Sequence, residues 1–117
     1  MWIYKDVCGL GGAYKHIHPF KQAVVAHFIK SLPDWVDYVI VFGSATMPFC
    51  REDSDIDICI IGDYPEDLSN FTDSRMPGES YDFLFYKSPE QLLAKAELSI
   101  QNVERDIYEK GVVVYAK

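Results

Sequence analysis

The 117 residues include 49% hydrophobic and 15% aromatic side chains, which indicates a single folded domain with a real core and excludes a disordered chain. With 11 basic and 18 acidic side chains, the formal net charge is −7. This charge disfavours general binding to nucleic acid and to anionic membrane surfaces, because both are themselves negatively charged.

The first 18 residues are expected to form an irregular lead-in to one domain that spans residues 1–117, because Gly9, Gly11 and Gly12 give this stretch flexibility. The N-terminus lacks the continuous apolar segment of a signal peptide, and no stretch approaches the roughly 20 apolar residues of a membrane span. The three cysteines have no metal-binding spacing, and their odd number argues against a complete disulfide framework. We therefore expect a cytoplasmic protein with free thiols and no membrane segment.

Two histidines close this lead-in. His16 and His18 are two residues apart, a spacing that superficially resembles a metal-binding pair. Because no carboxylate partner is nearby in the sequence, we interpret them as surface residues.

A helix is predicted over roughly residues 19–32. Pro19 suits its first turn, and apolar side chains then recur at steps of three and four. The pair Leu32-Pro33 ends the helix, since the residue before a proline is disfavoured in helical conformation.

The first strand is predicted over residues 35–42, a run rich in β-branched and aromatic side chains. Gly43-Ser44 breaks this strand and can open a short helix, which Pro48 would end.

The second strand is predicted over residues 55–61, where polar and apolar side chains alternate. Asp55, Asp57 and Cys59 fall on one face, and the isoleucines between them fall on the other. The two carboxylates therefore project side by side. Like charges this close repel each other, so the arrangement calls for a compensating cation.

A polar connection over residues 63–78 leads to a third predicted strand, residues 80–86, in which Asp82 stands between two aromatic side chains. A further helix starts at Ser88, which can cap it, and its apolar stripe is expected to run on to Ile107.

Gly111 ends that helix, and residues 112–116 form a last short strand. Strands that alternate with helices predict an α/β (α+β) fold, in which helices cover a small mixed sheet.

The candidate site combines carboxylates with a phosphate-binding turn. Asp55, Asp57 and Asp82 would form an oxygen-rich site of the kind that Mg²⁺ prefers. Two such ions can hold a triphosphate, activate a hydroxyl and neutralise a leaving pyrophosphate. Gly43 lets a phosphate approach the backbone closely, and Ser44 adds a hydroxyl donor.

These residues carry a family resemblance. Gly43-Ser44, followed after ten residues by Asp55-Ile56-Asp57, resembles the signature of the minimal nucleotidyltransferases of the DNA polymerase beta superfamily. Asp82, within "SYDFLF", is similar to the later strand aspartate of that family. The resemblance spans about residues 20–117.

The resemblance implies a nucleotidyltransferase fold and metal-dependent transfer of a nucleoside monophosphate from a triphosphate, with ATP as the expected donor. Asp55 and Asp57 would bind two Mg²⁺ ions. Asp82 would help to ligate the catalytic ion and to deprotonate the acceptor hydroxyl. Gly43 and Ser44 would hold the phosphates of the nucleotide.

One segment departs from the family pattern. Many members follow Gly-Ser with x-Ala-Arg-Gly, whereas this chain has Met47 and Pro48 in the last two positions. Arg51 is the candidate that could supply the missing cation by reaching back to the nucleotide. The departure also favours an alternative function, in which the fold serves as a binding or regulatory module with little catalysis.

Small free-standing members of this family often pair with a HEPN-type toxin ribonuclease, for which they act as antitoxins by adenylylating a tyrosine. The resemblance therefore implies a protein adenylyltransferase-like enzyme, and the acidic charge suits a basic partner. With 117 residues there is little chain for a private acceptor domain, so we expect a partner or a second copy to complete the acceptor site.

Overall fold

The computed structural model describes residues 16–68 and 77–117. The elements follow in the order α2 (Pro19–Phe28), 3₁₀ helix η2 (Ile29–Ser31), β1 (Val36–Phe42), 3₁₀ helix η3 (Gly43–Thr46), β2 (Ile56–Gly62), β3 (Tyr81–Tyr86), α3 (Pro89–Ala96), α4 (Val103–Lys110) and β4 (Val112–Ala116). The predicted lead-in lies, up to residue 15, outside the described residues.

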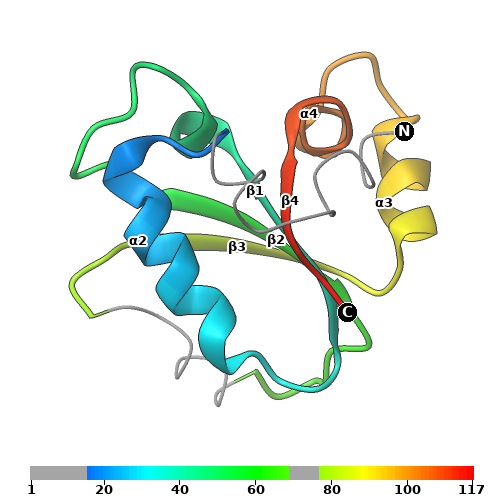
Figure 1. The fold of residues 1–117 in the computed structure, drawn as a ribbon. Coiled ribbons are helices and arrows are strands. Elements are labelled where there is room, and N and C mark those ends of the chain that lie inside the picture. Colours follow the sequence, from blue (N-terminus) through cyan, green and yellow to red (C-terminus); the bar gives the residue numbers. More distant parts are fainter. Residues whose placement is uncertain (1–15, 69–76) are drawn as a thin grey trace.

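The strands form one mixed sheet in the order β3-β2-β1-β4 (Figure 1). The central strand β1 pairs antiparallel with both β2 and β4, and β2 pairs parallel with β3. This sheet with helices packed on it confirms the predicted α+β class.

Helices cover both faces of the sheet: α2 lies on one side, and α3 and α4 lie on the other (Figure 1). Ile56, Ile58 and Ile60 are buried in the cluster that includes Phe28 of α2. Cys59 belongs to the opposite cluster, which includes residues of α3 and α4. The predicted alternation along β2 is therefore confirmed, and it places Asp57 on the α3–α4 side.

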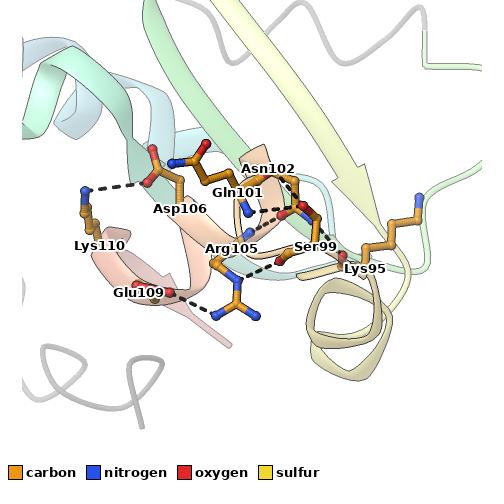
Figure 2. Close-up of polar contacts among 8 residues, drawn as sticks. All are labelled: Lys95, Ser99, Gln101, Asn102, Arg105, Asp106, Glu109 and Lys110. Atoms are coloured by element: carbon orange, nitrogen blue, oxygen red, sulfur yellow. Dashed lines mark hydrogen bonds and ion pairs between the residues drawn. The ribbon is translucent and has the colours of Figure 1, made fainter. Parts of the chain in front are cut away.

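The prediction of one continuous C-terminal helix is wrong, because residues 97–102 separate α3 from α4. Asn102 makes the break: its Oδ1 accepts from the backbone N–H of Arg105 at 2.7 Å and caps α4, while its Nδ2 donates to the carbonyl of Lys95 at 3.0 Å (Figure 2). Ile100, which the predicted stripe would bury, is 86% exposed. Local side-chain bonds to the backbone thus outweigh the helical spacing.

Cys50 and Cys59 are buried free thiols, and Cys8 lies outside the described residues. Within residues 16–68 and 77–117, no helix has the length and apolar character needed to cross a membrane.

Candidate active site

The turn between β1 and η3 brings the backbone against a carboxylate. Gly43 has φ of +73°, and a Cβ added to it would lie 2.2 Å from Oδ2 of Asp57. Phe42, the residue before it, is the register partner of Asp57. Only glycine satisfies both the backbone angle and the space at this position.

Asp57 and Asp82 lie side by side, since they are register partners on the parallel strands β2 and β3. Both line a cavity of about 390 Å³, to which Gly43 and Asp106 of α4 also contribute. Asp57 is half-buried and Asp82 is exposed. The structure thus brings together three of the predicted site residues: one from the turn and one from each of two strands.

The electrostatics of the cavity penalise the ionised form of Asp57. Burial raises the pKa of its carboxyl group, and the charges of Asp82 and Asp55 raise it further. Asp55, which directly precedes β2, is therefore close enough to act on Asp57, although it is not among the described residues that line the cavity. A bound cation would relieve this repulsion.

The carboxylates do not form a preformed metal centre. In the described part of the chain, no group of three or more His, Cys, Asp and Glu side chains is arranged to hold a metal ion. The donor chemistry nevertheless fits Mg²⁺, because all three ligands would be hard carboxylate oxygens that repel one another without a cation. The metal-binding roles of Asp55, Asp57 and Asp82 remain predictions.

The predicted phosphate turn forms a short 3₁₀ helix that ends before Pro48, as expected. The backbone N–H of Met47 donates to the carbonyl of Ser44 at 2.9 Å, and the hydroxyl of Thr46 donates to the carbonyl of Gly43 at 2.8 Å. These bonds hold the turn in shape beside Asp57. Ser44 itself is not among the described lining residues of the cavity, so its phosphate contact stays a prediction.

The side chain of Arg51 is paired with a neighbouring carboxylate. Its guanidinium donates two hydrogen bonds to the carboxylate of Asp53, at 3.0 and 2.9 Å, and both side chains are exposed. This pairing lowers the pKa of Asp53. The nucleotide-binding role predicted for Arg51 is therefore untested, and it would require Arg51 to leave Asp53.

Sequence reasoning missed Lys21, which is completely buried on α2. Its ammonium donates to the carbonyl of Glu52 at 2.9 Å and to the carboxylate of Glu79 at 3.2 Å. Glu52 belongs to the loop before β2, and Glu79 lies two residues before β3. Lys21 thus joins the two segments that lead to Asp57 and Asp82. The sequence does contain a sign that Lys21 is buried, because Lys21 lies at helical spacing from the buried Val24, Val25 and Phe28.

Sequence reasoning also missed Asp106, a further carboxylate of the cavity. It comes from α4 and lies 3.7 Å from the ammonium of Lys110, one turn further along the same helix (Figure 2). No local pattern distinguishes Asp106 from the other charges of α4, because only the packing of this helix on the sheet brings it to the cavity.

Residues 24–114 match a family model described as "Nucleotidyltransferase domain". The match covers most of the chain and includes Gly43, Asp57 and Asp82. No curated protein and no solved structure is significantly similar to the chain.

Proposed function

Because the chain belongs to the nucleotidyltransferase domain family, we propose that it transfers AMP from ATP to a hydroxyl group of a partner protein, with release of pyrophosphate. The observation that carries the proposal is the cavity in which the crowded backbone of Gly43 meets the adjacent carboxylates of Asp57 and Asp82. In the reaction the acceptor oxygen bonds to the α-phosphorus, and the bond between that phosphorus and the bridging oxygen of pyrophosphate breaks.

Each residue has a distinct part in this proposal. Asp55, Asp57 and Asp82 would hold Mg²⁺, which would neutralise phosphate charge and lower the pKa of the acceptor hydroxyl. Asp82 is the more exposed of the two adjacent carboxylates, so it would take the proton of the acceptor. The turn that begins at Gly43 would present its backbone to a phosphate, and Ser44 would donate its hydroxyl to that phosphate.

A protein acceptor is supported by the surface beside the cavity. Leu98, Ile100 and Val103 are 82%, 86% and 41% exposed, and Val103 also lines the cavity. A contiguous patch of exposed apolar side chains is typical of surfaces that contact another protein, and these three residues lie close together in sequence between α3 and the first turn of α4. From the family resemblance, we propose that a tyrosine of a basic, HEPN-type toxin is the acceptor, so that the protein acts as an antitoxin.

A second candidate function is a binding or regulatory module with little catalysis. Met47 and Pro48 favour it, as does the pairing of Arg51 with Asp53, because neither arrangement offers a cation to the nucleotide at this turn.

The test is transfer of label from α-labelled nucleoside triphosphates, with Mg²⁺, to the candidate partner. Asp57→Asn is expected to reduce transfer at least about a hundred-fold, since a catalytic metal ion contributes several kcal/mol and about 1.4 kcal/mol is tenfold in rate. Asp63→Asn, a matched change just beyond the other end of β2, should leave transfer unchanged. Partner binding without any transfer by the parent protein would favour the regulatory module and overturn the enzyme.

A further inference from the structure

The first turn of α2 is joined to the three segments that carry the candidate site. His18, the N-cap of α2, donates its backbone N–H to the carbonyl of Ala45 in η3 at 2.7 Å. Lys21, in the same turn, donates its ammonium to the carbonyl of Glu52 at 2.9 Å and to the carboxylate of Glu79 at 3.2 Å. The turn after β1 and the segments before β2 and β3 are therefore all held by one end of one helix.

The two anchors of Lys21 lie close to the candidate metal ligands along the chain. Glu52 precedes Asp55 by three residues, and Glu79 precedes Asp82 by three residues. Three residues span at most about 11 Å even when they are fully extended. A displacement of either anchor would therefore be passed on to one of the carboxylates.

Beyond these anchors the two segments pair at once. The backbone N–H of Ile56, the first residue of β2, donates to the carbonyl of Ser80 at 2.9 Å. Asp57 and Asp82 follow as the second residues of β2 and β3, and they are register partners. Lys21 thus links the two segments immediately before they enter the sheet, where it can fix how the two strands begin.

The burial of Lys21 makes this link costly to break. Its side chain is completely buried, and that of Glu79 is 25% exposed. Removing one partner of a buried ion pair leaves the other charge uncompensated. An apolar side chain of similar volume, however, often serves stability as well as a buried ion pair does. Stability alone therefore does not account for a lysine at this position.

We propose that Lys21 is a positioning residue for the candidate metal site, which sets the separation of the three aspartates through its two anchors. The inference rests on the metal-dependent transfer proposed above, and it assigns the group that keeps the carboxylates at a distance one cation can bridge. Lys21 is not among the described residues that line the carboxylate cavity, so it would act through the chain and not by touching the nucleotide.

Mn²⁺ binding tests this role without nucleotide and without any reaction. Mn²⁺ suits carboxylate ligands, and its electron paramagnetic resonance signal reports the free ion during a titration. Lys21→Met should weaken Mn²⁺ binding about tenfold, within the range usual when a supporting group of a metal site is removed. The loss of charge alone predicts the opposite, because removing a positive charge favours the binding of a cation.

Two comparisons separate position from charge and from stability. Lys30→Met removes an exposed lysine just beyond the end of α2 and should bind Mn²⁺ as the parent does. Glu79→Gln and Glu79→Ala remove the same charge, but only Gln keeps an oxygen that can accept from Lys21. Glu79→Ala should therefore bind Mn²⁺ about tenfold more weakly than Glu79→Gln. Far-UV circular dichroism at the titration temperature gives the folded fraction, to which each affinity is referred.

The positioning role is overturned if folded Lys21→Met binds Mn²⁺ as tightly as the parent or more tightly, or if Glu79→Ala and Glu79→Gln bind it alike. Equal binding by the parent and Asp57→Asn would place the ion elsewhere and would also overturn it. The proposed transfer fails separately: Mn²⁺ binding would then depend on Lys21 as described, while the parent protein labels no acceptor.

Discussion

Among the described residues, Gly43 and Gly78 have positive φ angles, +73° and +87°. A Cβ at Gly78 would meet nothing within 4 Å, whereas a Cβ at Gly43 would collide with Asp57. Substituting Gly78 therefore tests backbone strain alone, whereas substituting Gly43 tests strain together with crowding against the carboxylate of Asp57.

We expect Gly78→Ala to lower the free energy of unfolding by about 1–2 kcal/mol, the cost of a left-handed conformation, and to retain transfer activity. Gly43→Ala should lose more stability and at least about tenfold in transfer, because Asp57 must move. Urea denaturation and the label-transfer assay provide the measurements. Equal activity of the two variants would contradict a role for close packing at Gly43.

Asp57 should make the protein less stable as the pH rises. Its pKa is raised in the folded state by burial and by Asp82 and Asp55, so the folded protein holds this proton more tightly than the unfolded chain. The stability linked to Asp57 is thus fully present below the unfolded pKa and is lost as the pH rises through the folded pKa.

Asp57→Asn should therefore have a higher Tm than the parent at pH 7 without divalent metal, and the difference should vanish near pH 3, where the carboxyl is protonated in both states. Thermal unfolding followed across this pH range measures the effect. If the parent were as stable as Asp57→Asn at pH 7, the ionised carboxylate of Asp57 would not destabilise the folded protein.

Turning to the elements, Lys21 links α2 to the segments that precede β2 and β3. Removing Glu79 leaves a buried ammonium without its carboxylate, and breaking such a pair costs about 3–5 kcal/mol. Replacing the lysine by an apolar residue of similar shape removes the buried charge itself. Glu79→Ala should therefore destabilise the fold more than Lys21→Met, as measured by urea denaturation. The reverse order would mean that packing, and not charge, decides the role of Lys21.

The hairpin of α3 and α4 depends on Asn102, which caps one helix and donates to the end of the other (Figure 2). Asn102→Ala should lower stability by about 1–2 kcal/mol, because it removes the cap and the link to Lys95. Asn102→Asp keeps an acceptor for the cap and loses only the donor to Lys95. Its stability should therefore lie between that of the parent and that of Asn102→Ala. If Asn102→Ala were as stable as the parent in thermal unfolding, this account would be contradicted.

The sequence predicts the strands closely because each is a β-branched or aromatic run bounded by turn residues, and period-two alternation assigns Asp57 to its face. It also predicts that Asp82 lies on a neighbouring strand, but it does not reveal that Asp82 is the register partner of Asp57, since register between strands so distant in the chain is decided by packing across the whole sheet. The helix break escapes prediction because the apolar spacing continues through Ile100, and only its 86% exposure shows that it is not buried.

For the molecule as a whole, the net charge of −7 and the exposed apolar side chains of the α3–α4 hairpin bear on the protein partner that we propose. A basic protein with an apolar docking face would be attracted by the charge and held by burial of Leu98 and Ile100.

Ile100→Asp should weaken binding of that partner at least about tenfold, because a charge would enter the apolar contact. The Tm should stay unchanged, since Ile100 is 86% exposed and is not part of the core. Calorimetry with the partner and thermal unfolding measure the two effects. Unaltered partner binding would place the docking face elsewhere.

Finally, β3 is an outer strand of the described sheet, and it carries the aromatic side chains of Tyr81, Phe83 and Phe85. An outer strand of this composition can pair with the strands of other molecules, and a charge on it opposes such pairing. The exposed Asp82 is the second residue of β3. The carboxylate that we propose as a metal ligand would thus also oppose aggregation, and neutralising it would remove that protection whatever it did to the reaction.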